Sequence, residues 1–150
     1  MTSVSYRIAQ LEDVESVFNY EYKKIAVEGA HEIENQILVW NSFFRKEALE
    51  HYFKLGWSFL ALNPKQEILG FFMGQPLLFI DKQTQSLWVE HISADNPEIY
   101  TELVDIAYRL SREKHLQRVL VSSVVKSQSL TKSFPFQDWD RQNSILKTTK

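Results

Sequence analysis

The stretch that most constrains the fold is residues 85–112, whose apolar pattern changes from that of a strand to that of a helix without a linker. Alternation along residues 85–94 predicts a strand. One predicted face of this strand carries Leu87, Val89 and His91, and the opposite face carries Trp88, Glu90 and Ile92. Asn96 suits a helix N-cap and Pro97 the first helical position. The apolar helix face then consists of Ile99, Leu103, Ile106, Ala107 and Leu110. A strand that ends where a helix begins offers backbone N–H groups to an anion or a polar ligand.

The N-terminal part of the chain reads as one strand followed by helices. Residues 4–9 alternate as a short strand, and residues 11–25 carry apolar side chains at helical spacing. Residues 30–40 are predicted to be a loop that passes into a helix. A helix over residues 41–55 is predicted to end at Gly56.

The following segment indicates an antiparallel meander joined to a parallel strand. Apolar runs at 57–62, 67–75 (extending to 80) and 85–94 are separated by short polar turns. Residues 118–125, rich in β-branched side chains, follow the central helix and predict a parallel crossover pair. A small hairpin is predicted around residues 140–143. We therefore expect one α/β domain with a mixed sheet spanning residues 1–150.

Charge and composition exclude several function classes. A net charge of -2 among 150 residues gives no electrostatic case for nucleic acid as a partner. The most apolar stretch, residues 68–80, is much shorter than the ~20 residues of a membrane helix, so we expect no membrane partner. The chain has no cysteine and no basic-then-apolar leader, which favours the cytoplasm. The four histidines have no metal-ligand spacing, so no metal is predicted.

Several short motifs occur in an order that resembles a known superfamily. They are Tyr6-Arg7-Ile8-Ala9 before Leu11-Glu12-Asp13, the run 57–62 before Ile68-Leu69-Gly70-Phe71, and Phe136 near the end. Together with the order of elements, they resemble the GNAT superfamily of N-acyltransferases. The resemblance covers nearly the whole chain. It implies a single GNAT-like domain that transfers an acyl group from a thioester donor to an amine.

The resemblance implies a general base late in the fourth strand, at Glu90 or His91. A carboxylate or an imidazole there can take a proton from an attacking amine. The structural alternative is that both are ordinary strand residues, and it stays open for each.

The same resemblance implies a binding site for the pantetheine arm of the donor. Backbone groups of Val89 to His91, the Asn96 helix start, and Ser122 or Ser123 in the fifth strand are the candidates. The two serines also fit as small polar residues tolerated in a strand. A nucleophilic Ser123 lacks any recognisable triad spacing.

The phosphate-binding motif of the superfamily is replaced in this chain. After the fourth strand, acyl-CoA users carry a six-residue motif: Arg or Gln, any two residues, Gly, any one residue, and then Gly or Ala. In this chain the corresponding residues 95–100 are DNPEIY. Pro97 removes a backbone donor. Asp95 and Glu98 add negative charge beside a pyrophosphate, costing on the order of 1 kcal/mol each. These residues disfavour the usual phosphate contacts.

Aromatic residues near the first two helices fit either an apolar substrate pocket or the core. They are Tyr20, Tyr22, Trp40, Phe43 and Phe44. Pockets for small molecules are mostly apolar, but aromatic residues at helical spacing also fill cores.

Two functions of different class remain open. The first is an N-acyltransferase that uses acetyl-CoA, another acyl-CoA or an acyl carrier, with a small-molecule or peptide amine as acceptor. The second is a non-catalytic binding or dimerisation module on the same fold, and self-association into a homodimer is left open. A third option is an enzyme on this fold whose donor is not CoA.

Overall fold

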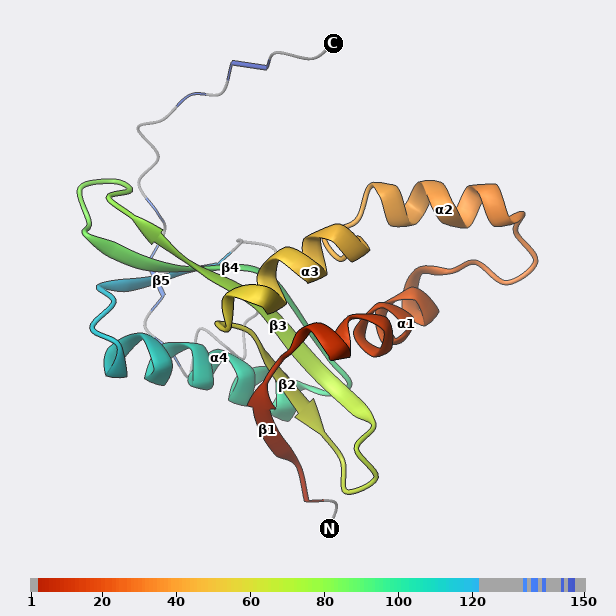
Figure 1. Ribbon diagram of the computed structural model, residues 1–150, viewed down its shortest axis with the longest axis horizontal. Coiled ribbons are helices and arrows are strands. Elements are labelled where there is room, and N and C mark those ends of the chain that lie inside the picture. Colours follow the sequence, from red (N-terminus) through yellow and green to blue (C-terminus); the bar gives the residue numbers. More distant parts are fainter. Residues whose placement is uncertain are drawn as a thin grey trace.

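A five-stranded sheet forms the centre of the fold, with strands in the order β1-β2-β3-β4-β5 (Figure 1). The computed structural model describes residues 3–121, 134, 136–137, 139, 144 and 146–147. The strands are β1 (Ser5–Ile8), β2 (Phe59–Leu62), β3 (Ile68–Leu78), β4 (Gln85–Ala94) and β5 (Arg118–Val121). The helices are the 3-10 turn η1 (Leu11–Asp13), α1 (Val14–Ile25), α2 (Glu32–Trp40), α3 (Lys46–Leu55) and α4 (Pro97–Glu113). Among the described residues, no helix has the length and apolarity needed to cross a bilayer.

The strand pairing confirms the predicted meander and the parallel pair. β1 to β4 pair antiparallel in sequence order, and β4 pairs parallel with β5 from Ser86↔Arg118 to Val89↔Val121. The turn between β2 and β3 forms because the Asn63 side chain accepts the N–H groups of Lys65 and Glu67, each at 2.9 Å. The fold class is therefore α/β with a mixed sheet, as predicted.

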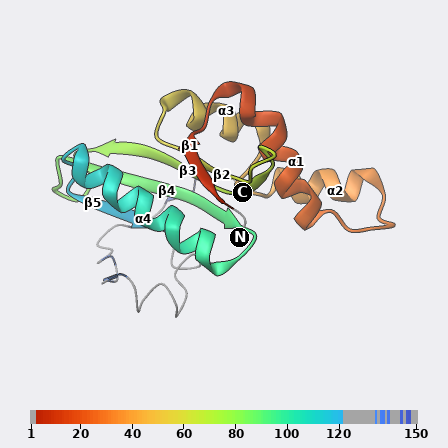
Figure 2. The same cartoon turned by 90° about the horizontal axis from the view of Figure 1, so that it is seen from below.

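Helices cover both faces of the sheet (Figure 2). The sheet therefore separates the hydrophobic core into two clusters. Phe72, which is fully buried, packs in the cluster that α4 covers, whereas its neighbour Phe71 packs in the cluster under α1 and α3. Successive strand residues point to opposite faces, so β3 supplies both halves of the core. Of the five residues on the predicted apolar face of α4, Ile99, Leu103, Ile106 and Ala107 are buried and Leu110 is half-buried.

A β-bulge in β4 corrects the predicted alternation of that strand. Met73 pairs with His91 but Gly74 pairs with Val89, so Glu90 is an extra residue in the ladder. Beyond the bulge the side chains change faces. Ile92 therefore packs in the cluster under α4, and the prediction that His91 shares a face with Val89 was wrong.

The third helix begins later than the predicted residue 41. The Ser42 hydroxyl donates to the carbonyl of Val39 at 2.7 Å, which closes α2 instead of starting a new helix. Arg45 has non-helical backbone angles, and α3 begins after it at Lys46. Gly56 then ends α3 in the left-handed conformation, as predicted. The predicted hairpin around residues 140–143 and strand residues 122–125 lie outside the described residues.

Candidate functional site

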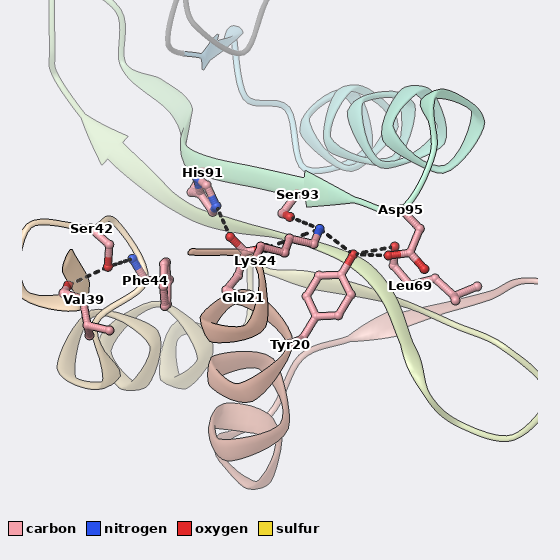
Figure 3. Close-up of polar contacts among 10 residues, drawn as sticks. All are labelled: Tyr20, Glu21, Lys24, Val39, Ser42, Phe44, Leu69, His91, Ser93 and Asp95. Atoms are coloured by element: carbon pink, nitrogen blue, oxygen red, sulfur yellow. Dashed lines mark hydrogen bonds and ion pairs between the residues drawn. The ribbon is translucent and has the colours of Figure 1, made fainter. Parts of the chain in front are cut away.

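The candidate site is built on a pair of side chains from β4 and α1 (Figure 3). His91 Nε2 lies 3.1 Å from Glu21 Oε2. The bulge in β4 turns His91 toward α1, where Glu21 lies on the buried side of the helix. An ionised carboxylate only accepts hydrogen bonds, so Nε2 carries the proton in this pair. Nδ1 is then the basic nitrogen of the neutral ring.

Two opposing effects set the charge of Glu21. Burial favours the neutral carboxyl, but the hydrogen bonds with His91 and Ser93, the charge of His91 when its ring is protonated and the charge of Lys24 outweigh it, so the pKa of Glu21 lies below its usual value. Lys24 Nζ lies 3.6 Å from the second carboxylate oxygen. Glu21 is therefore a buried anion that can stabilise a protonated His91.

Two aromatic rings flank His91. The Phe43 ring stacks on the imidazole with centroids 6.0 Å apart and an interplanar angle of 18°. Phe71 approaches from the core at 5.7 Å. The His91 side chain is 23% exposed, so an incoming small molecule can reach it. The imidazole–carboxylate pair therefore lies between aromatic rings, a mostly apolar setting with a polar anchor that is typical of small-molecule sites.

Glu90, the other predicted base, lies on the same face but is held differently. Trp88 Nε1 donates to Glu90 Oε2, and the Tyr52 hydroxyl donates to the same oxygen at 3.3 Å. Burial, and then the charge of Glu90, raise the pKa of Tyr52 to about 12, so the phenol stays neutral. Two donors thus engage one carboxylate oxygen of Glu90.

The start of α4 is capped by the chain itself. Asn96 Oδ1 accepts the N–H of Ile99 at 2.9 Å, and the Asn96 carbonyl accepts the N–H of Tyr100 at 3.1 Å. Pro97 has no N–H to offer. The Ile99 amide is therefore already bonded, and the carboxylates of Asp95 and Glu98 add negative charge beside this helix start.

A polar strap ties α1 to the end of β4 (Figure 3). Lys24 Nζ donates to the Tyr20 hydroxyl at 2.9 Å and to Ser93 Oγ at 2.8 Å. The Tyr20 hydroxyl lies 2.7 Å from Asp95 Oδ1. Burial, and then the contact with Asp95, raise the pKa of Tyr20, which therefore stays a neutral donor. The strap fixes α1, and with it Glu21, against the strand that carries His91.

Comparison with known proteins assigns the fold. No protein-family model and no curated protein matches the sequence. A possible acetyltransferase from Clostridium difficile 630 matches with a TM-score of 0.67 and 11% identity, covering 98% of this chain and 99% of that chain. A predicted acetyltransferase from Clostridium acetobutylicum, solved with acetyl-CoA, matches with a TM-score of 0.57 and 14% identity, covering 96% of each chain. The polyamine N-acetyltransferase of Drosophila melanogaster matches with a TM-score of 0.63 and 13% identity, covering 90% of this chain and 83% of that chain. The chain has the GNAT fold.

Within this GNAT fold, the predicted donor-binding residues lie in different settings. Val89 is fully buried in the sheet and pairs with Gly74 and Val121. Asn96 uses its side chain to cap α4. Ser122 and Ser123 lie outside the described residues. The structure thus places Glu90 and His91 on the face of the sheet that α1 and α3 cover, and the Asn96 side chain caps α4.

Sequence reasoning missed Glu21 and Lys24, the partners of His91 and Ser93 on this GNAT scaffold. One signal was available in the pattern of the first long helix. Glu21 follows Val14 by seven residues and Val17 by four, and both valines are buried, so its carboxylate interrupts an apolar stripe. A charged residue at such a position is rarely fully buried unless it is paired.

The depressed pKa of Glu21 predicts a pH dependence of stability. The ionised form is favoured in the folded chain, so the stabilisation is present above the usual glutamate pKa, near 4.5, and is lost as pH falls through the lower folded value. We expect the free energy of unfolding of Glu21→Gln to fall below that of the wild type above pH 5, and the difference to shrink toward pH 3. Urea unfolding across this pH range measures it. A pH-independent difference would contradict the assigned charge.

Proposed function

We propose that this chain transfers an acyl group from a thioester to an amine, with His91 as the general base. The observation that supports it is the hydrogen bond between His91 and the buried Glu21, at the bulge of the fourth strand in a GNAT fold. A partly exposed imidazole oriented by a buried carboxylate is an arrangement suited to accepting a proton from an amine.

In the proposed reaction, the amine nitrogen attacks the thioester carbonyl and its proton passes to Nδ1 of His91. The carbon–nitrogen bond forms, the carbon–sulfur bond breaks, and the sulfur leaves as a thiolate. Glu21 stabilises the resulting imidazolium through the hydrogen bond at Nε2. Protonation of the thiolate and loss of the proton from His91 return the site to its starting state. Glu90 is assigned a positioning role, since Trp88 and Tyr52 already engage it.

We assign the thioester arm of the donor to the bulge in β4. We do not assign a nucleotide portion of the donor to the start of α4. The extra residue of a bulge leaves the ladder locally unpaired, so backbone groups near Glu90 are available to an amide-containing arm. The self-capped start of α4 supports a donor recognised without its pyrophosphate. A fold relative solved with acetyl-CoA makes pantetheine thioesters the first donors to test.

This assignment predicts how two donor analogues bind. Because the start of α4 adds no phosphate contact, CoA and pantetheine are expected to bind with dissociation constants within about threefold of each other, a difference under 1 kcal/mol. Isothermal titration calorimetry measures both constants. Binding of CoA at least 100 times tighter than pantetheine would show that phosphates are recognised, and the site would then need to be placed elsewhere.

A second candidate function is a non-catalytic binding module. Asp95, bonded to Tyr20, and Asn96, which caps α4, favour it, because they lie in the segment where the GNAT resemblance implies phosphate binding. The two candidates differ in one property, the turnover of a thioester.

Incubation with acetyl-CoA or acetyl-pantetheine and a panel of amines, followed by mass spectrometry of the products, separates them. Agmatine belongs in the panel because a relative of the same fold forms N-acetylagmatine. We expect an amide product in excess of the uncatalysed background. A panel of small-molecule and peptide amines that gives no amide above background would favour the binding module.

A further inference from the structure

Helix α2 carries an apolar stripe on the side that faces solvent. Ile33, Ile37 and Trp40 follow one another at the spacing of one helix face and are 69%, 56% and 67% exposed. Phe43, just after the helix, is 57% exposed. Figure 1 shows that α2 projects away from the sheet, beyond the end of α1. We define these four residues as the α2 stripe.

The opposite side of α2 fixes its rotation. Asn35 is buried, and its side-chain oxygen accepts the backbone N–H of Val27 at 3.0 Å. At the C-terminal end of α2, the Ser42 hydroxyl donates to the carbonyl of Val39. Because Asn35 holds the buried side of α2 against Val27, the α2 stripe on the opposite side faces outward.

From the apolar exposure and the charge of this face, we propose that a second copy of the chain covers it, with the two α2 helices packed antiparallel about a twofold axis. Each of the four side chains of the α2 stripe is more than half exposed, and an exposed apolar patch rimmed by polar residues is typical of a protein interaction surface. A standard interface buries ~800 Å² per partner, and homodimer interfaces are about 65% apolar. The stripe supplies the apolar part of such an interface.

Charges at the two ends of α2 favour the antiparallel arrangement. The first turn is acidic, with Glu32 and Glu34 exposed. The guanidinium of Arg45 lies 4.8 Å from the centre of the Trp40 ring, at the other end of the stripe, and its Nε also lies 3.3 Å from Oε1 of the exposed Glu47. Antiparallel packing brings Glu32 of one copy to Arg45 of the other, twice, whereas parallel packing brings like charges together.

The interface would border the candidate site. Phe43 belongs to the α2 stripe and also stacks on His91. A second copy on the stripe therefore covers the outer face of the ring that flanks the imidazole. Dimerisation and acyl transfer remain separable, since the stripe contains neither His91 nor Glu21.

Light scattering during size-exclusion chromatography, from roughly 1 to 100 µM protein, tests the dimer. We expect the full chain to approach twice its mass of 17.7 kDa as concentration rises. Ile37→Lys is expected to remain a monomer with an unchanged circular dichroism spectrum. Leu55→Lys, at an apolar residue 42% exposed at the end of α3, is the matched control and is expected to dimerise like the wild type. A wild-type monomer at all concentrations, or a dimer unaffected by Ile37→Lys, would overturn the proposal.

A charge swap tests the antiparallel order. Glu32→Arg and Arg45→Glu each place like charges at both ends of a homodimer, so each alone is expected to dimerise at least tenfold more weakly. Mixing the two variants restores opposite charges at both ends, because one copy then carries two arginines and the other two glutamates. A mixed dimer close to wild-type strength is expected. No gain on mixing would overturn the antiparallel arrangement.

Discussion

Replacement of His91 by Gln is expected to lower kcat/KM for acyl transfer by about 10²- to 10⁴-fold, the range for loss of a general base. Gln keeps a polar side chain beside Glu21 but cannot accept the proton of the amine. The dissociation constant of the thioester is expected to change little, because the donor is assigned to the strand backbone. Steady-state kinetics and calorimetry on the same preparation measure the two quantities.

A matched substitution controls for the loss of a histidine. His31 precedes α2 as its N-cap residue, and its side chain makes no capping hydrogen bond, so His31→Gln is expected to keep wild-type kcat/KM. Glu90→Gln is expected to cost much less than His91→Gln, because Glu90 already serves Trp88 and Tyr52. A His91→Gln protein that folds and retains wild-type turnover would remove His91 as the base.

Replacement of Phe72 by Ala is expected to lower the free energy of unfolding by about 3–5 kcal/mol. The side chain is fully buried and stacks on Phe59 with ring centroids 5.8 Å apart. It packs between the sheet and α4, so truncation leaves a cavity that neighbouring side chains fill only in part. The loss is a large part of the 5–15 kcal/mol that stabilises a typical domain. Urea unfolding followed by far-UV circular dichroism measures it.

Phe79→Ala is the control for that measurement. Phe79 is 78% exposed in the turn after β3, so its truncation is expected to change the free energy of unfolding by less than about 0.5 kcal/mol. A cost below about 1 kcal/mol for Phe72→Ala would contradict the packing of α4 on the sheet.

Local chemistry was sufficient to predict most of the fold. The Asn96 cap, Pro97 and the apolar spacing that follows predicted α4, because each acts within a few residues of its position. Gly56 marked the end of α3 for the same reason. The start of α3 was predicted too early because the hydrogen bond of Ser42 to Val39, which closes α2, leaves no mark in the apolar pattern.

The apolar pattern of the sequence does not predict the bulge in β4. Strict alternation assigns His91 and Val89 to one face, but one extra residue at Glu90 reverses every later side chain. The pairing of Gly74 with Val89 is a property of two strands together. The same shift brings His91 to Glu21, so the step that creates the candidate site is also the step that the pattern of one strand cannot reveal.

Sequence reasoning named only one member of the His91–Glu21 pair, for a related reason. Glu90 and His91 were selected by resemblance, and the structure places both on one face of the sheet. Glu21 lies 70 residues away in sequence from His91, and only the packing of α1 on the sheet joins them. The acidic, proline-containing start of α4 was visible directly, and the structure adds that Asn96 caps it.

Amide formation from acetyl-pantetheine and an accepted amine, followed as a single turnover in the wild type, Glu21→Gln and His91→Gln, is the most direct measurement of whether the His91–Glu21 pair performs acyl transfer. We expect the rate to fall in that order, with His91→Gln about 10²-fold or more below the wild type and Glu21→Gln between them. Equal rates in all three folded proteins would contradict the role of the pair.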